Sequence, residues 1–399
     1  MLTSYATETH LISRFRYPST GKRLRPSLHL AMLLDTSGSM NGERINAVKR
    51  TLQSILPLLL KTDHVTLVSF NSSAQILAHY QTPENLITVI QNLHCEGNTN
   101  LEEGFLKLIE ASKDVEPYDA VLLLTDGQIN DGCYNTAGLN IIADAVPGRW
   151  RAFYCIGYGS SHNRQLLRQL AMRTHGSYIY IQAETDLPAS MSTLLTGLRE
   201  EVLANVVLSS VNGWASQEIT SYGAKDHNLG CIQADKDYWV VWEKQQPESS
   251  RYLSVSWSAS TLDSAGGGAA NVRAYVLCAD VLPEDFRVQL IRVRAVKLLK
   301  EAADALETGQ PVSHELYDLA RELSQMNSTN PLILRLRADI AAVIDSVNSN
   351  PTSIALMATA SASAAYYATQ RGCSGDPTDI YSTPLQRQVS NSTQDVYNS

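Results

Sequence analysis

The sequence predicts an α/β fold: a doubly wound, mostly parallel sheet, extended by an additional antiparallel β module and a C-terminal helical bundle. Three observations lead to this prediction. Nearly unbroken apolar runs alternate with helical periodicity over residues 28–203, which is typical of strands covered on both faces by helices. Short segments rich in Val, Tyr, Trp and Ser follow over 204–282, separated by turn residues. Helical periodicity returns over 283–350, where short loops favour a bundle.

The α/β domain is expected to span 28–203 and to begin with the apolar run LHLAMLLD at 28–35, a buried strand. Residues 43–61 follow with apolar side chains at helical spacing, and Pro57 should kink the end of that helix. Further strands are expected at 64–70, 74–80, 119–127, 150–159 and 176–182. Further helices are expected at 83–93, within 97–112, at 163–174 and at 186–202.

The flanking regions have different textures. Residues 1–27 contain a strand-like stretch at 2–16 that we expect to pair with the β module. The strands of that module, which resembles a sandwich, are expected at 205–211, 216–222, 230–243, 251–260 and 271–279. The bundle helices are expected at 283–309, 312–326 and 330–347. The last stretch, 351–399, is Ala/Ser-rich and low in charge; we expect a poorly ordered tail, unless it docks on a partner or on the chain's own domains.

Composition limits the classes of function. The formal net charge of the 399 residues is −8, which argues against nucleic-acid or membrane-surface binding as the main role. The six cysteines are far apart and form no CxxC pair, so neither a disulfide framework nor a zinc site is expected. The sequence contains no apolar run long enough for a membrane span and no secretory signal pattern. We therefore expect an intracellular, cytoplasmic protein.

Polar side chains lie next to three of the predicted α/β elements: at the ends of two strands and just before one helix. The first strand ends in D-x-S-x-S, which comprises Asp35, Ser37 and Ser39. Asp126 follows the buried apolar part of a later strand, 119–124. Thr99 precedes the helix that starts near 101. Because ligands of a doubly wound sheet lie at the carboxyl ends of its strands, we expect these side chains to converge. Hydroxyl and carboxylate oxygens suit Mg²⁺ or Mn²⁺ and exclude a soft zinc site.

Taken singly, these residues have simpler explanations. Ser37 and Ser39 could be turn and N-cap residues of the helix at 43–61, and Asp126 could form an Asx-turn with Gly127. These explanations do not account for all three loops together, so we favour the metal site.

Three short motifs give the first region a family likeness. D-x-S-x-S at 35–39, G-x-T-N at 97–100 and T-D-G at 125–127 resemble, in order and approximate spacing, the metal-ion-dependent adhesion site of von Willebrand factor type A domains. The resemblance covers 28–203, and 204–350 also resembles the region that follows such domains in intracellular multi-domain relatives. It implies that the adhesion site is intact, with Ser37, Ser39 and Thr99 binding Mg²⁺ (or Mn²⁺ or Ca²⁺) directly and Asp35 and Asp126 acting through water.

The function that the resemblance implies is a non-catalytic, Mg²⁺-dependent protein–protein interaction module or scaffold, whose partner presents an Asp or Glu. The residues expected at the partner-binding rim are Met40, Asn98, Asn100 and Gln128. No serine elbow of the G-x-S-x-G type is present, and Ser37 stands where a haloacid-dehalogenase-type phosphatase needs an acid, so catalysis is not expected. Two alternatives remain: a structural subunit of a coat, virion or other large assembly, and an accessory subunit of an ATPase or a hydrolase.

Overall fold

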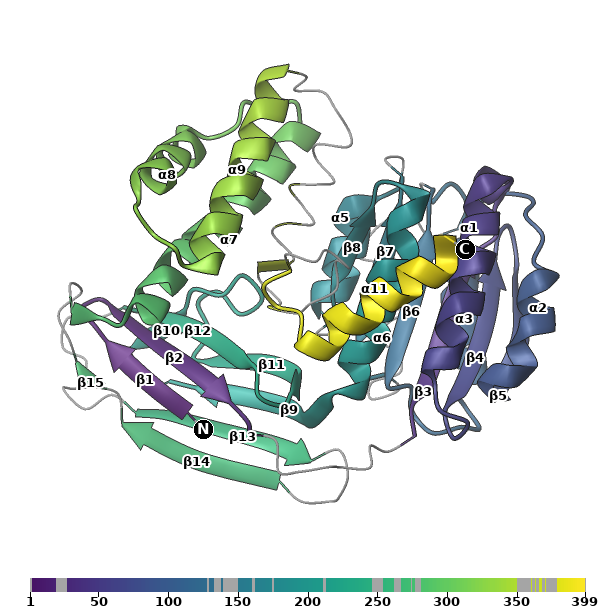
Figure 1. The fold of residues 1–399 in the computed structure, drawn as a ribbon, viewed down its shortest axis with the longest axis horizontal. Helices are drawn as coiled ribbons and strands as arrows, with labels where there is room; N and C mark the ends of the chain where they lie inside the picture. The colour runs from purple at the N-terminus through teal and green to yellow at the C-terminus, as the bar shows by residue number, and fades with distance from the viewer. Residues whose placement is uncertain are drawn as a thin grey trace. The chain divides into compact units, whose positions relative to one another are not determined.

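The computed structural model describes most of the chain, in two compact units. The described residues are 2–18, 27–127, 129–132, 138, 150–159, 162–173, 176–210, 213–245, 254–261, 267–273, 275–276, 281–349, 360, 363, 366–367, 370 and 379–398. One unit comprises Pro26–Arg199 and Arg371–Ser399, and the other comprises Met1–Arg25 and Glu200–Gln370. The predicted fold class is confirmed: a mostly parallel sheet with flanking helices, additional antiparallel sheets and C-terminal helices are all present (Figure 1).

The first unit is built on a six-stranded sheet with the strand order β5-β4-β3-β6-β7-β8. Its strands are β3 (His29–Asp35), β4 (His64–Phe70), β5 (Ala74–Gln81), β6 (Ala120–Thr125), β7 (Phe153–Tyr158) and β8 (Tyr178–Ile181). The pairs are parallel except for β4 with β5. The chain builds outward from β3 on one side and then returns to add β6 on the other. The switch point of the sheet therefore lies between β3 and β6, where such folds bind ligands.

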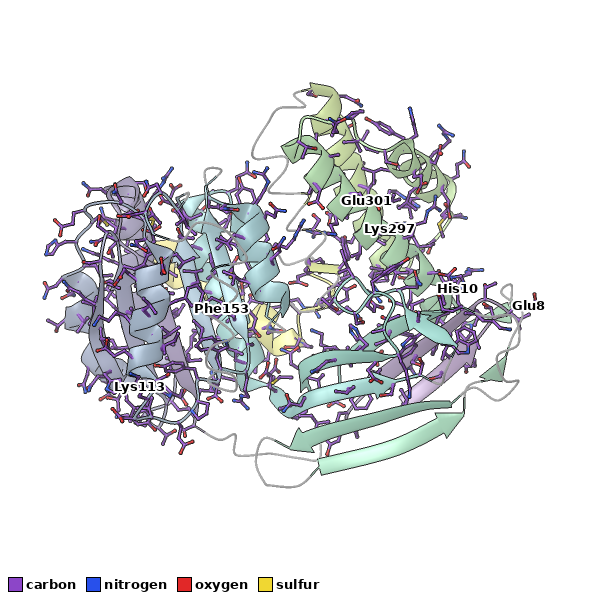
Figure 2. All side chains as sticks on the ribbon, turned by 180° about the vertical axis from the view of Figure 1, so that it is seen from behind. Glu8, His10, Lys113, Phe153, Lys297 and Glu301 are labelled. Carbon is purple, nitrogen blue, oxygen red and sulfur yellow. The ribbon has the colours of Figure 1, made fainter. Side chains whose placement is uncertain are left out.

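Helices cover both faces of this sheet, as the continuous apolar strands require. They are α1 (Glu43–Ile55), α2 (Ile87–Gln91), α3 (Leu101–Ala111), α5 (Arg164–Arg173) and α6 (Leu187–Arg199). Alternate residues of β3, such as Leu30 and Met32, join Leu52 of α1 in one core cluster. On the other face α3 approaches closely, because a Cβ on Gly104 would lie 3.1 Å from side-chain atoms of both Leu33 and Phe70. Phe153, whose ring stacks on that of Phe105, also lies on this face (Figure 2).

The end of the chain belongs to the same unit: residues 384–398 form a helix there, which is the open alternative of a tail that docks on the chain's own domains. Helix α11 (Pro384–Asn398) packs against α6. Over 384–395, where its side chains are described, the buried positions are Gln386, Ser390 and Thr393, polar residues at helical spacing. Gln386 Nε2 donates to the Thr193 carbonyl at 2.8 Å, and Ser390 Oγ donates to the Ala189 carbonyl at 3.3 Å. The helix escaped prediction because its buried side chains over 384–395 are polar rather than apolar.

The second unit contains a β sandwich. One sheet has the order β10-β12-β2-β1-β15 and the other β11-β9-β13-β14. The strands are β1 (Leu2–Ala6), β2 (His10–Arg16), β9 (Glu201–Ser209), β10 (Trp214–Ser216), β11 (Asp226–Gln233), β12 (Asp237–Lys244), β13 (Ser254–Thr261), β14 (Gly267–Arg273) and β15 (Tyr275–Val276). β2 pairs antiparallel with β12 along its whole length. Phe15, Leu208 and Trp242 meet between the two sheets in one buried cluster.

The strand predicted at 230–243 is wrong as a single element. It is two strands, β11 and β12, joined by a turn in which Asp235 adopts a φ of 56°. A short polar residue tolerates this left-handed conformation, which ends one strand and starts the next. The strand predicted at 216–222 is also wrong in its bounds. β10 is Trp214–Ser216, and bends and turns follow it up to residue 222. Part of the strand predicted at 271–279 lies outside the described residues.

Three helices complete this unit: α7 (Glu284–Glu307), α8 (His314–Gln325) and α9 (Pro331–Ser349). Phe286 of α7 packs with Ile12 and Trp239 on the outer face of the first sheet. Exposed ion pairs run along α7, such as Lys297 with Glu301 at 4.0 Å (Figure 2). Over the described part of the chain, every helix is too short or too polar to cross a bilayer.

Two buried histidines make the first unit acid-sensitive. Burial lowers the pKa of His29 and of His162 to about 4. His29 is held neutral between the Glu116 carbonyl, at 3.0 Å from Nδ1, and Thr66 Oγ1, at 3.1 Å from Nε2. Because an unfolded histidine has a pKa of about 6.5, the unfolded chain binds more protons below that pH. The stability is therefore present above pH ~6.5 and is lost as the pH falls towards 4.

We expect each of these histidines to cost the unit about 2 kcal/mol of stability between pH 7 and pH 5. Urea unfolding at the two pH values measures the loss. In His29→Gln the difference between the two pH values should shrink by about that amount, whereas in His94→Gln, at an exposed position of the same unit, it should not change. An unaltered pH difference in His29→Gln would refute this account.

Candidate metal centre

Three loops meet at the carboxyl edge of the sheet, at its switch point. The loop after β3 starts at Asp35, and the loop after the neighbouring strand β6 starts at Asp126. The loop that contains Thr99 leads into α3. Backbone hydrogen bonds tie the first of these loops to the third: Gly38 N donates to the Gly97 carbonyl at 3.0 Å, and Glu96 N donates to the Thr36 carbonyl at 2.9 Å. The loops therefore form one surface rather than three separate turns.

The side chains that follow β3 and β6 contact each other directly. Ser39 Oγ donates to Asp126 Oδ1 at 2.7 Å, and the hydroxyl oxygens of Ser37 and Ser39 are 3.0 Å apart. Asp35 accepts hydrogen bonds from the Ser37 backbone N at 2.8 Å and from the Thr125 hydroxyl at 2.5 Å. Asp35 thus reaches across from β3 to β6, while Asp126 reaches back to the first loop.

Thr99 joins the same cluster around Gly127, where side-chain oxygens crowd the position that a Cβ would take. A Cβ placed on Gly127 would lie 3.1 Å from Thr99 Oγ1, 3.6 Å from Ser39 Oγ and 3.9 Å from Asp35 Oδ2. Oxygens from two of the loops, those of Thr99, Ser39 and Asp35, therefore lie around a point beside Gly127, which belongs to the third loop. The structure brings the five predicted site residues together: Asp35, Ser37, Ser39, Thr99 and Asp126.

The electrostatics of this cluster favour a cation. The side chains of Asp35 and Asp126 are both fully buried, whereas Ser39 is exposed and opens the cluster to solvent. Burial raises the pKa of Asp35 to about 6, and the nearby charge of Asp126 adds to the shift. Two close, buried carboxylates repel each other, so a bound positive charge relieves a cost that the fold carries without it.

The donor set also selects the kind of cation. In the described part of the chain no three His, Cys, Asp or Glu side chains cluster as a metal site does. The five site residues are not such a cluster, because only Asp35 and Asp126 are acids and the other three side chains carry hydroxyl groups. Neutral and anionic oxygens without nitrogen or sulfur fit a hard ion such as Mg²⁺. The residues present therefore fit the ion that the motif implies.

The predicted partner-binding rim needs correction. Met40 is wrong as a rim residue, because its side chain is fully buried in the core, where the turn Gly38–Met40 tucks it. Asn100 is also buried and serves as the N-cap of α3, accepting from Glu103 N at 3.2 Å. Asn98 is exposed, as a rim residue should be. Gln128 lies outside the described residues.

Three further residues take part, and sequence reasoning missed them. Thr125 bonds Asp35 from the end of β6, and Asn130 Oδ1 accepts from Thr99 N at 2.8 Å. Both lie in the stretch TDGQIN, so their closeness to Asp126 was a usable signal. Arg44 pairs with Asp126 from the first turn of α1. The sequence gives no reason to single out Arg44, because a charged residue at the start of a helix is expected to be exposed to solvent.

The fold and these loops resemble a von Willebrand factor type A domain, and comparison with known proteins agrees for that part of the chain. The family model described as the von Willebrand factor type A domain matches residues 29–193. Inter-alpha-trypsin inhibitor heavy chain H3 of Mus musculus is 28% identical over 198 residues, which are 46% of this chain and 22% of that protein. An uncharacterized protein of Synechocystis sp. is 28% identical over 193 residues, which are 46% of this chain and 44% of that one. The chain thus spans less than half the length of either relative.

Two solved structures share the fold over more of the chain. The von Willebrand factor type A protein from Catenulispora acidiphila has a TM-score of 0.64 and 16% identity, covering 83% of this chain and 88% of that one. The ArnB paralog VWA2 from Sulfolobus acidocaldarius has a TM-score of 0.60 and 17% identity, covering 91% and 95%. At such identities the likeness extends to the fold alone.

Proposed function

We propose that this chain is a non-catalytic protein-binding module that grips a carboxylate of its partner through Mg²⁺. The observation that carries the proposal is the meeting of three loops at Gly127: oxygens of Thr99, Ser39 and Asp35 lie around it, and Ser39 donates to Asp126 of the Gly127 loop. Ser37, Ser39 and Thr99 would bind the ion directly, and Asp35 and Asp126 would act through water. Mn²⁺ or Ca²⁺ are the other hard cations that such a donor set accepts.

The chain's own residues explain why the site suits docking. A bound divalent cation supplies positive charge and open coordination positions for an incoming oxygen. Ser37 and Thr99, as neutral ligands, would leave that charge largely uncompensated, because the two carboxylates would contact the ion only through water. Ser39 lies at the exposed side of the cluster, where a partner's Asp or Glu has access. Hydrogen bonds from Thr125 and from the Ser37 backbone hold Asp35 in place before any partner arrives.

The remaining parts of the chain fit a supporting role in this proposal. The β sandwich and the helices α7–α9 would serve as a mount or as a second contact surface. Helix α11 packs on its own unit, which offers no support for a tail that reaches neighbouring subunits of a coat or virion. We further propose a reducing intracellular setting, which the thiols of Cys95 and Cys155, neither of them in a disulfide bond, suit.

Affinity capture tests the proposed function. A protein partner should be retained on the immobilised chain in Mg²⁺, released by EDTA, and absent when the bait is Asp35→Ala. Once that partner is identified, changing its contacting Asp or Glu to Asn or Gln should abolish retention. A partner that stays bound in EDTA and to Asp35→Ala would exclude docking through the metal, although the fold would stand.

A further inference from the structure

Arg44 places a permanent positive charge inside the candidate metal centre. It is the second residue of α1, and its Nη1 forms an ion pair with Asp126 Oδ2. The same nitrogen donates to the Ser39 carbonyl at 3.4 Å. The Asp126 side chain is fully buried, whereas 36% of the Arg44 side chain is exposed. The guanidinium therefore spans from the buried acid to the solvent-facing side of the site.

Part of the hydrogen-bonding capacity of this guanidinium is left over. Gly159, just after β7, lies beside the guanidinium: a Cβ there would be in ordinary van der Waals contact, 3.6 Å from Arg44 Nη2. Both oxygens of Asp126 are engaged, one by the Ser39 hydroxyl and one by Arg44. Among the described residues, Nε and Nη2 of Arg44 donate to no acceptor. A guanidinium has five N–H donors, so part of its capacity faces outward.

We propose that Arg44 is a specificity-determining residue that makes the loaded site prefer an anionic ligand, at the expense of affinity for the cation. This inference rests on the proposed function. The formal charges of Asp35 and Asp126 equal that of one divalent cation in size, although they lie outside its direct ligands, so with Arg44 the loaded site carries a formal net charge of about +1. A partner's carboxylate then meets both the metal and a guanidinium that can donate to it in a fork.

Charge repulsion predicts the direction of the effect on the cation. Two positive centres that share Asp126 oppose each other, and Asp126 cannot fully serve both. Removing the charge of Arg44 while keeping a polar side chain should therefore tighten cation binding. A purely structural Arg44, needed only to hold Asp126, would give the opposite result, because its loss would loosen the site. The two roles are thus separated by sign.

Calorimetric titration of the full chain with Mg²⁺ tests the inference, using wild type, Arg44→Gln and the control Arg50→Gln. Arg50 lies on the same helix and pairs with Glu43 at 3.6 Å. We expect Arg44→Gln to bind Mg²⁺ about ten-fold more tightly than wild type and Arg50→Gln to match wild type. Repeating the titrations in sodium acetate, against sodium chloride at equal ionic strength, probes the carboxylate. Acetate should raise the apparent affinity of wild type for Mg²⁺ more than that of Arg44→Gln, because a ligand of the loaded site is linked to cation binding.

The outcomes separate the inference from the proposed function. If wild type takes up no Mg²⁺, the proposed function fails and the inference fails with it. If wild type binds Mg²⁺ but Arg44→Gln binds it equally or more weakly, or if acetate affects both alike, only the inference fails. Arg44→Lys keeps the charge without the fork, so its Mg²⁺ affinity should stay near that of wild type while its response to acetate falls.

Discussion

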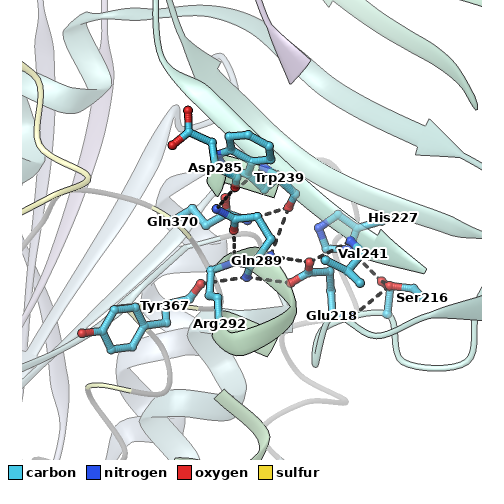
Figure 3. A network of polar contacts seen from close by, with 11 residues as sticks. Ser216, Glu218, His227, Trp239, Val241, Asp285, Gln289, Arg292, Tyr367 and Gln370 are labelled. Atoms are coloured by element: carbon cyan, nitrogen blue, oxygen red, sulfur yellow. Dashed lines mark hydrogen bonds and ion pairs between the residues drawn. The ribbon is translucent and has the colours of Figure 1, made fainter. Parts of the chain in front are cut away.

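Arg292→Met is expected to lower the free energy of unfolding of the β-sandwich unit by about 3–5 kcal/mol. Arg292 and Glu218 form a fully buried ion pair, with Nη1 2.9 Å from Oε2 and Nη2 2.5 Å from Oε1 (Figure 3). The remaining donors of Arg292 reach Gln289 Oε1 at 2.7 Å and the carbonyls of Tyr367 and Trp239. Without Arg292, the Glu218 carboxylate is left as an uncompensated buried charge.

Four of the five tryptophans lie in this unit, at 214, 239, 242 and 257, so urea unfolding followed by tryptophan fluorescence reports mainly on it. Arg294→Met is the matched control, because Arg294 on the same helix pairs with Glu322 in the open and should contribute less than ~1 kcal/mol. Replacing both Arg292 and Glu218 by apolar residues should restore much of the loss. Equal effects of Arg292→Met and Arg294→Met would show that the buried pair does not carry this unit's stability.

Asp35→Asn should have two opposite effects on the α/β unit. Without divalent cations at pH 7.5, it should stabilise the unit by about 1–3 kcal/mol. The pKa of Asp35 is raised to about 6 by burial, so the stability is present at low pH and is lost as the pH rises through 6, where the buried carboxylate ionises. An amide removes that penalty, yet it also removes the charge that attracts the cation.

Differential scanning calorimetry in EDTA and in Mg²⁺ separates these effects. Wild type should melt below Asp35→Asn in EDTA and should rise in Mg²⁺ by mass action, whereas the variant should not respond. Asp114→Asn, at an exposed position, serves as the control for the charge change. The proposal that Asp35 is a destabilising carboxylate that a cation relieves is wrong if Asp35→Asn melts below wild type in EDTA. It is also wrong if Mg²⁺ raises the melting temperature of the variant as much as that of wild type.

The sequence was most informative where apolar patterning and the motif coincided. The run at 28–35 predicted β3, and the polar residues after it lie at the strand end, as expected. Asp126 and Thr99 could be placed because strand order in a doubly wound sheet brings their loops to one edge. Met40 could not be placed from the sequence, because a methionine after Gly and Ser fits an exposed rim and a buried core equally well. In the structure the tight turn Gly38–Met40 directs it into the core.

Other features depend on tertiary contacts that no local pattern encodes. Over the described side chains of α11, the buried residues are Gln386, Ser390 and Thr393. Their polarity predicts an exposed face, and only the neighbouring carbonyls of α6 explain their burial. Arg292 reads as one more charge on an amphipathic helix, since Glu218 is distant in the sequence. Arg44 was missed for the same reason: its partner, Asp126, comes from another loop.

The central claim is that three loops form one cation site, and titration calorimetry of Thr99→Ala with Mg²⁺ tests it most directly. Thr99 comes from a loop that contributes neither aspartate, and Thr62→Ala, at an exposed turn, is the matched control. We predict that wild type and Thr62→Ala each bind one Mg²⁺ per chain with the same affinity. Thr99→Ala should bind Mg²⁺ at least about ten-fold more weakly. Equal Mg²⁺ binding by wild type and Thr99→Ala, or none by wild type, would contradict the account.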